Sequence, residues 1–173
     1  MSDGTAAAEP LELREWAAGD LAVVEGTMGA VTATRHLGGP EPAAKLAERH
    51  ARYLALAGSG LGRMFVIVTG PDAQPAGSVG FWDAEWAGAR VYEMGWSVLP
   101  AFWGQGIATR ATVLALAHAR EAGKHRRVHA FPSVENLASN AVCRKAGFTL
   151  AGEVEVEYPK GRPMRAHDWR YDL

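Results

Sequence analysis

The chain has 173 residues, of which 48% are hydrophobic and 21% are charged, values typical of one globular domain. Its formal net charge of -1 provides no positive field for a nucleic-acid partner, and its single cysteine, Cys143, excludes an internal disulfide and a cysteine-based metal cluster. No apolar run approaches the roughly 20 residues that span a bilayer, and no signal-peptide pattern occurs, so we expect a cytoplasmic protein without a membrane partner.

The start of the chain predicts a short leader followed by one domain. Residues 1–10 are small and polar and are expected to be flexible, and residues 11–173 are expected to form the single domain. Its first predicted elements are a strand over 11–16, a helix over 21–28 that Asp20 precedes, a loop over 32–42, and a helix over 43–57 that Gly58 ends.

The middle of the chain predicts an antiparallel meander, because short strands and turns follow one another closely. The strands are expected at 64–68, 78–82 and 91–99, and the turns at 70–77 and 85–90. In the last strand, Glu93, Gly95 and Ser97 alternate with larger apolar residues and should face the opposite side of the sheet. Pro100 cannot donate to a sheet ladder, so the pairing should stop there.

The second half predicts a strand that lies parallel to the strand at 91–99. A helix from Ala108 to Gly123 leads to a strand at 127–131, and such a connection is a right-handed crossover. The expected inner positions of this helix are Ala111, Leu114 and His118. The tail is a predicted hairpin, and its acidic row of Glu153, Glu155 and Glu157 is interpreted as a solvated strand face.

Basic residues gather between the predicted helix and the strand at 127–131. Lys124, His125, Arg126 and Arg127 are interpreted as a solvated helix exit, where cations suit the negative end of the helix dipole. The alternative is contact with an outer phosphate of a bound ligand. Arg35 and His36, in the loop over 32–42, are similarly either exposed loop residues or substrate contacts.

A glycine-rich loop joins the strand at 91–99 to the helix that follows it. Gly104, Gly106 and Ala108 occur at every second position. Small side chains let a ligand approach the main chain, and the first amides of a helix have no intrahelical partner and carry the positive end of its dipole. The pattern therefore suits a phosphate or pyrophosphate, and a tight turn without a ligand is the alternative.

Two nucleotide-binding motifs fit this loop poorly. A P-loop requires a Gly-Lys-Ser/Thr ending, which is absent here. The dinucleotide fingerprint expects an acidic residue about 20 positions later, where this chain has Arg126 and Arg127.

A second motif follows at a distance along the chain. Asn136 precedes Ser139 by three positions and is a favourable helix N-cap, and Gly147 is a favourable stop. The motif closes with Lys145, Gly147 and Phe148.

The two motifs together resemble those of the GCN5-related N-acetyltransferases, the GNAT family. That family's acyl-CoA loop, Arg/Gln-x-x-Gly-x-Gly/Ala, corresponds to residues 103–108 here. Trp103 departs from the first position, as in the branch of ribosomal-protein N-acetyltransferases of the RimJ/RimL type. The resemblance covers residues 11–173. It implies a mixed α+β fold with a mostly antiparallel sheet of about six to seven strands, about four flanking helices, and a splayed parallel strand pair that forms the acyl-CoA slot.

The resemblance also implies the reaction, which is direct transfer of an acetyl group from acetyl-CoA to a primary amine, without a metal. The acceptor is a small molecule or a protein N-terminus, and the protein is expected to act alone or as a homodimer. The residues that it implies for binding the co-substrate are Val98, Leu99, Trp103, Gly104, Gln105, Gly106, Ile107, Ala108, Thr109, Asn136 and Ser139.

Two side chains are predicted to carry the chemistry. Glu93 is an acid within a strand that should be central, where burial would raise its pKa toward that of a useful general base; the alternative is a structural acid paired with a nearby arginine. The resemblance implies that Ser139 protonates the leaving thiolate, and the alternative is an idle helix-terminal serine. Asn136 either holds the pantetheine arm or only caps its helix, and Asn140 is a weaker candidate. Cys143 is interpreted as a packed hydrophobe.

Two functions other than acetyl transfer stay open at this point. One is a catalytically silent acyl-CoA-binding regulatory domain, which would bind the ligand without releasing CoA. The other is a phosphate- or NADP-binding module. The sequence does not identify the acceptor amine.

Overall fold

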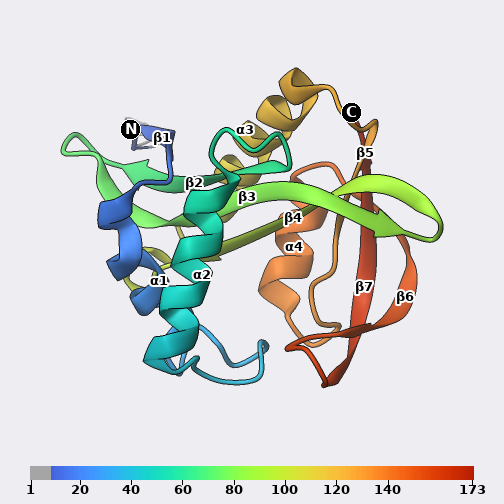
Figure 1. Cartoon of the computed structure of the whole chain (residues 1–173), viewed down its shortest axis with the longest axis horizontal. Coiled ribbons are helices and arrows are strands. Elements are labelled where there is room, and N and C mark those ends of the chain that lie inside the picture. The colour runs from blue at the N-terminus through green and yellow to red at the C-terminus, as the bar shows by residue number, and fades with distance from the viewer. Residues whose placement is uncertain (1–8) are drawn as a thin grey trace, which may run out of the picture.

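The computed structural model describes residues 9–173, so most of the expected leader lies outside the described residues. Its strands form one seven-stranded sheet in the order β1-β2-β3-β4-β5-β7-β6 (Figure 1). Neighbouring strands are antiparallel, except that β4 and β5 are parallel. The strands are β1 (Leu11–Glu15), β2 (Gly62–Thr69), β3 (Gln74–Trp86), β4 (Ala89–Val98), β5 (Arg127–Ala130), β6 (Thr149–Glu157) and β7 (Pro163–Asp172).

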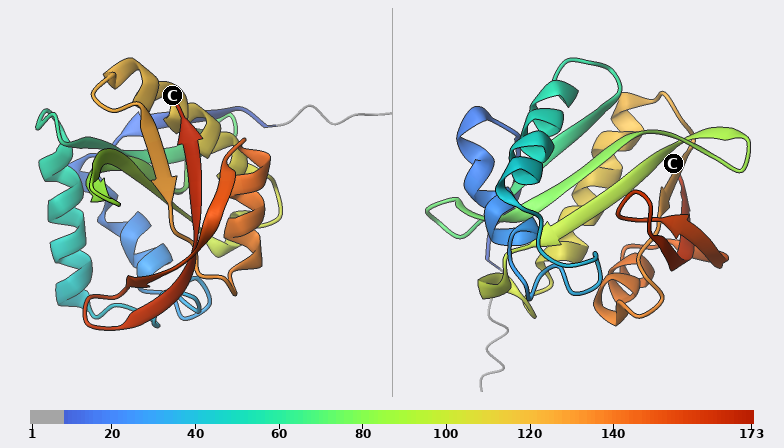
Figure 2. Two further views of the ribbon diagram at one scale, coloured as in Figure 1. Left: turned by 90° about the vertical axis from the view of Figure 1, so that its right-hand side faces the viewer. Right: turned by 60° about the horizontal axis from the view of Figure 1, so that its bottom comes forward.

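Helices cover both faces of this sheet. In the left view of Figure 2, α2 lies at one side of the sheet and α4 at the other. None of the helices in the described part of the chain has the length and apolar character that crossing a membrane requires. The helices are α1 (Leu21–Met28), α2 (Ala43–Leu56), α3 (Ile107–Ala122) and α4 (Leu137–Lys145), with short 3-10 turns η1 (Ala18–Asp20) and η2 (Pro100–Phe102).

Each face of the sheet has its own hydrophobic core. On one face, Val24 of α1 and Leu46 of α2 pack with Val66 of β2. On the other face, α3 and α4 pack on β2–β5, and Tyr92 and Leu116 belong to this larger cluster. The side chains of β4 therefore alternate as expected. The even-numbered residues pack in the core under α3 and α4, and Glu93 faces the side of the sheet that α1 and α2 cover.

The predicted turns of the meander were too long. The β2–β3 turn closes within 70–73, where the Ala73 amide donates to the Gly70 carbonyl at 3.1 Å. The β3–β4 turn consists of Ala87 and Gly88, whose φ values of 50° and 77° match the two-residue hairpin that follows strand twist. Because these turns are compact, the strands extend beyond their apolar centres. The sequence pattern identified only those apolar centres.

The expected inner face of α3 was only partly correct. Ala111 is buried, but Leu114 is 38% exposed, and the buried row instead includes Thr112, Ala115 and Ala119. His118 is partly buried and stacks on Phe65 with ring centroids 4.8 Å apart. Small residues face the sheet because α3 packs closely on it, so larger Leu114 is left outside.

Candidate active site

The parallel pair β4–β5 is joined only briefly and then separates. Its register covers Tyr92 with Val128 and Glu93 with His129, and β4 continues to Val98 without this partner. On the other side of β4 the antiparallel ladder with β3 continues as far as Leu99. A slot therefore opens beside the second half of β4, as the resemblance implied.

The hydrogen bonds between β3 and β4 determine which main-chain groups of β4 face this slot. The Leu99 amide donates to the Ala76 carbonyl of β3 at 2.8 Å. In an antiparallel pair alternate residues bond to the partner, so Trp96 and Val98 direct their amides toward the slot. The Leu99 amide therefore already has a protein partner, whereas the Val98 amide faces the slot. The contacts of both residues with the co-substrate stay predictions.

The loop before α3 presents free main-chain amides. Gly104 and Gly106 have φ values of 75° and 71°, and no protein atom lies within 4 Å of a Cβ built at either one. The first bond of α3 is from the Arg110 amide to the Gly106 carbonyl. Within residues 9–173, none of the amides at 104–109 donates a hydrogen bond to the protein. This cradle, backed by the dipole of α3, fits the diphosphate of coenzyme A.

Trp103 differs from the rest of the predicted loop. Its amide donates to the Pro100 carbonyl at 3.2 Å, so it does not belong to the free amides. Its indole donates to the Val98 carbonyl at 2.8 Å, and the residue is 48% exposed. Trp103 thus closes the turn between β4 and α3, and the cradle begins at Gly104.

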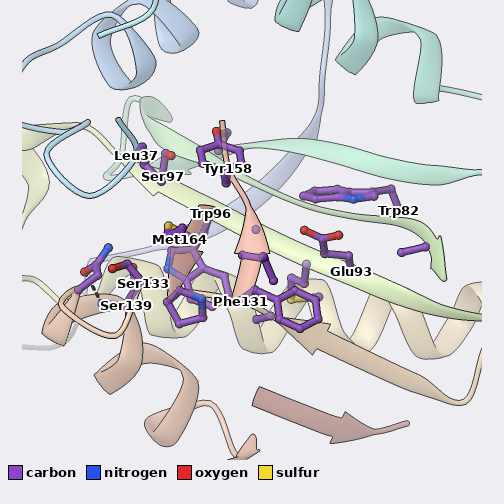
Figure 3. Close-up of a pocket in the computed structure, with 18 of the residues that line it drawn as sticks. Leu37, Trp82, Glu93, Trp96, Ser97, Phe131, Ser133, Ser139, Tyr158 and Met164 are labelled. Carbon is purple, nitrogen blue, oxygen red and sulfur yellow. Dashed lines mark hydrogen bonds between the residues drawn. The ribbon is translucent and has the colours of Figure 1, made fainter. Parts of the chain in front are cut away.

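A cavity of about 350 Å³ lies against the face of β4 that carries Glu93, Gly95 and Ser97. Glu93, Asn136 and Ser139 all line it, so the structure brings three predicted residues together. Leu37 lines it as well, but its neighbours in the loop, Arg35 and His36, are not among the lining residues. Figure 3 shows Ser139 and Glu93 at opposite ends of the cavity, with Trp82 and Phe131 near Glu93 and with Tyr158 between the two ends, close to Ser97.

Glu93 has the environment expected of a general base. Burial raises the pKa of its carboxyl group, and Trp82, its register partner on β3, acts in the opposite direction. Gly95 leaves room for the Trp82 ring, since a Cβ there would lie 3.0 Å from it. Within the described residues Glu93 forms no ion pair, so the alternative of a structural acid paired with an arginine finds no support.

The first turn of α4 places a serine at the other end of the cavity. The Asn136 side-chain oxygen accepts from the Ser139 amide at 3.0 Å, which makes Asn136 the N-cap. The Ser139 hydroxyl forms no hydrogen bond within the described residues, so it is available to a ligand. Asn136 therefore has its capping role, and only its side-chain nitrogen could still contact the pantetheine arm.

Asn140 is a structural residue. It is 5% exposed, and its side-chain nitrogen donates to the carbonyls of Ser133 and Asn136. Its oxygen accepts from His167 Nδ1 at 2.7 Å and from Trp169 Nε1 at 2.8 Å. All its hydrogen-bonding capacity is therefore used to fasten α4 to β7, and no local motif reveals partners that lie on a later strand.

Two other sequence interpretations are settled by the geometry. Lys124 and His125 pair with Asp83 beyond the C-terminal end of α3. A helix of this length separates them from the glycine loop by about 24 Å, so they do not reach a ligand phosphate there. Cys143 is fully buried, and burial raises the pKa of its thiol to about 12, which leaves it a packed hydrophobe.

Sequence missed a contact that crosses the rim of the cavity. Arg49 of α2 pairs with Glu41 and donates from Nη2 to the Tyr158 hydroxyl at 3.2 Å, and Tyr158 lies in the β6–β7 turn. Burial lowers the pKa of Arg49, but Glu41, Tyr53 and Tyr158 together outweigh this and raise it, so Arg49 stays charged. The contact ties α2 to the distant hairpin on either side of the cavity.

Comparison with known proteins supports the same assignment. The acetyltransferase (GNAT) domain model matches residues 10–149. RimL, a ribosomal L7/L12 alpha-N-protein acetyltransferase solved with coenzyme A, is similar with a TM-score of 0.77 and 24% identity over 94% of both chains. An acetyltransferase from Agrobacterium tumefaciens has a TM-score of 0.77 and 24% identity over 100% of this chain and 96% of that chain.

A further similar structure is the spermidine N-acetyltransferase from Vibrio cholerae in complex with CoA and spermine, with a TM-score of 0.76 and 19% identity over 94% of this chain and 95% of that chain. No curated protein matches. The expected fold is confirmed, and a RimL enzyme, from the expected branch, is among the similar structures. Because the family model covers most of the chain, the protein belongs to the GNAT family and is an N-acetyltransferase that uses acetyl-CoA.

Proposed function

We propose that the acetyl group passes directly from acetyl-CoA to a primary amine held in the cavity, with Glu93 as general base and Ser139 as proton donor to the leaving thiolate. The observation that supports this most is the arrangement around β4. Free amides at 104–109 lie beyond its end, and a cavity with Glu93 and Ser139 lies against its face. The thioester can then reach the cavity through the slot beside Val98.

Each group has a defined task in this proposal. The amides at 104–109 hold the diphosphate, and the slot-facing amides of Trp96 and Val98 divide between them pairing with the pantetheine arm and polarising the thioester carbonyl. Glu93 takes a proton from the attacking nitrogen as the N–C bond forms. The Ser139 hydroxyl donates its proton to the sulfur as the C–S bond breaks and takes a replacement proton from water, so CoA leaves as the thiol and Ser139 is restored.

The lining of the cavity favours an amine that carries an apolar or aromatic substituent. Trp82 and Phe131 flank the end at which Glu93 lies, and Tyr158 lies nearer the middle. Glu85 and Glu157 add two further carboxylates to the lining. Aromatic faces attract cations, and carboxylates complement them.

The direct test is release of the CoA thiol from acetyl-CoA in the presence of different amines. The panel contains arylalkylamines, polyamines, aminoglycosides and peptides with free N-termini, and we expect the arylalkylamines to give the highest kcat/KM. Binding of CoA without release for any amine would favour the silent regulatory domain. Thermal stabilisation by NADPH but not by acetyl-CoA would contradict the proposal altogether.

Three further proposals concern the whole protein. Residues 11–173 form a single acetyltransferase domain, which the continuous sheet supports. Acetyl-CoA is used inside cells, which supports a cytoplasmic location. The third proposal is a homodimer, and sedimentation equilibrium at micromolar protein decides between it and a monomer.

A further inference from the structure

A buried histidine–aspartate pair lies beside Glu93, and the proposed chemistry does not use it. His129 Nδ1 lies 2.6 Å from Asp168 Oδ1, and the two side chains are only 6% and 10% exposed. The indole of Trp86 donates to the other carboxylate oxygen, Oδ2, at 2.9 Å. Trp86, Asp168 and His129 thus form a hydrogen-bonded chain that crosses from β3 through β7 to β5.

The hydrogen bonds determine which nitrogen of His129 is free. An ionised carboxylate only accepts, so Nδ1 carries the hydrogen and Nε2 of the neutral ring keeps its lone pair. Nε2 has no hydrogen-bond partner within the described residues. Among residues 9–173, Thr112 Oγ1 is the one side-chain polar atom that is both completely buried and without a hydrogen-bond partner. Because Nε2 of His129 also has no partner, it must therefore be partly accessible to solvent.

The sheet register places this imidazole next to Glu93. His129 and Glu93 are direct partners in the parallel pair of β5 and β4, and neighbouring strands lie about 4.8 Å apart. Both side chains are on the cavity side, because Val128 and Ala130, on either side of His129, belong to the core under α3. This is also the last paired position before the slot opens.

We infer that His129 is a positioning residue that acts through Glu93, by accepting the proton that Glu93 removes from the amine. The inference rests on the proposed function. The N–H bond of the acceptor breaks as an O–H bond forms on Glu93, and a bridging water then carries this proton to His129 Nε2, because the described residues show no direct hydrogen bond between Glu93 and His129. Glu93 returns to its carboxylate form, His129 becomes an imidazolium beside the Asp168 carboxylate, and no electrons are transferred. The proton then leaves from Nε2 to water.

The charges around His129 suit this role. On its face of the sheet lie Glu93 from β4, Arg127 from β5, and Asp168 and Arg170 from β7. Both arginines approach Asp172, with the Arg127 contact at 3.0 Å and the Arg170 contact at 3.9 Å. The carboxylates of Glu93 and Asp168 are therefore left to stabilise a positive charge on His129.

The chain offers a matched control for testing this inference. His125 Nε2 lies 3.0 Å from Asp83 Oδ1, with both side chains buried to a similar degree. This pair lies on the other face of the sheet, where His125 packs on Tyr92. The variants His129→Gln and His125→Gln therefore each remove one buried imidazole from a carboxylate, but only the first imidazole neighbours Glu93.

The test is the pH dependence of kcat/KM with a saturating amount of acetyl-CoA. We expect His129→Gln to lower kcat/KM roughly tenfold, less than the loss of the base itself would. We also expect the slope of log kcat/KM against pH on the acid side to fall by one unit in this variant, because the wild type has one more group whose protonation stops the reaction. CoA affinity should not change, and His125→Gln should keep the wild-type rate and slope.

The outcomes separate this inference from the proposed function. If Glu93→Gln is inactive but His129→Gln keeps the wild-type rate and slope, the inference is wrong and the proposed function stands. If Glu93→Gln itself has no effect, the base assignment is wrong. Should His129→Gln fail to fold, Asp168→Asn replaces it, because the amide oxygen still accepts from Nδ1 while the charge is lost. An unchanged rate and slope in Asp168→Asn would equally overturn the inference.

Discussion

The main-chain cradle before α3 and the cavity against β4 are built in different ways. The cradle before α3 offers main-chain amides from consecutive residues, 104–109, and needs only small or absent side chains there. The acceptor cavity is lined by side chains from β3, β4, α4 and the β6–β7 turn, which lie far apart in the sequence. The comparison teaches that a common ligand can be held by the backbone, while a particular acceptor must be selected by side chains.

The largest expected effect comes from a substitution that blocks the main-chain cradle. Gly106→Trp places a bulky ring in the open space that the diphosphate would occupy, at a position with φ of 71°. Loss of even two hydrogen bonds to a charged group should weaken CoA binding at least about 100-fold. Isothermal titration calorimetry with CoA measures this.

Gly123→Trp is the control for that variant. Gly123 lies at the opposite end of α3 with a similar φ of 65°, and a Cβ there makes only ordinary contacts at 3.8 Å. It introduces comparable backbone strain without entering the cradle. Equal losses of CoA affinity in the two variants would mean that strain, and not blocked amides, explains the effect.

The next effect tests the side-chain end. Glu93→Gln should lower kcat/KM by about 10²–10⁴-fold with CoA affinity unchanged, because it removes the base but keeps the shape. The wild-type rate should rise with pH as Glu93 ionises, above the usual range for a glutamate, since burial raises its pKa. Glu155→Gln, on the exposed face of β6, is the control. A pH profile that Glu93→Gln leaves unaltered would exclude Glu93 as the base.

Ser139→Ala should have a smaller effect at the other end of the cavity. Loss of one hydrogen bond to the developing thiolate should lower kcat about tenfold, with little change in KM for the amine. A thioester of a more acidic thiol needs less help in leaving, so its rate should fall less. Ser59→Ala, in the exposed turn after α2, should leave kcat unchanged. An equal loss for both thioesters would contradict this role of Ser139.

Glu93→Gln should also stabilise the protein slightly. Because the folded-state pKa of Glu93 is raised, its contribution favours folding below the unfolded-state pKa and is lost as pH rises through the folded-state value. The Tm of the variant should equal that of the wild type near pH 4 and exceed it by up to a few degrees at pH 8. A variant that is less stable at pH 8 would show that the carboxylate has a stabilising partner.

Trp103→Phe should have the smallest effect. It removes the indole bond to the Val98 carbonyl but leaves the main-chain cradle intact. CoA affinity should change by no more than about threefold, as expected for one neutral hydrogen bond at the surface. A tenfold loss in calorimetry would show that the cradle depends on a side chain after all.

The backbone end of the site could be predicted from the sequence because its information is local. Gly104 and Gly106 are required for their positive φ values, and the N-cap at Asn136 follows from its position before α4. The sequence did not reveal that the Leu99 amide is already bonded, since its partner, Ala76, belongs to a strand that precedes it by a hairpin. The pattern of one strand does not show which edge of that strand is already bonded.

The acceptor end could be predicted only in part. Glu93 was identified because an acid within a central strand requires an explanation. Its neighbours Trp82 and His129 were not identified, because register across three strands brings them together. Leu114 was placed inside α3 for a related reason, since helical spacing alone does not distinguish a face lined by alanines from one lined by leucines.

The central claim is that main-chain amides of the loop before α3 hold the diphosphate of coenzyme A. Amide nitrogen–proton NMR spectra of the labelled protein, recorded during titration with CoA, test it most directly. The account predicts large shifts and slowed hydrogen exchange for the amides of Gly104, Gly106 and Ile107, with Gly123 unchanged. Saturable binding of CoA that leaves the loop amides unshifted would contradict it.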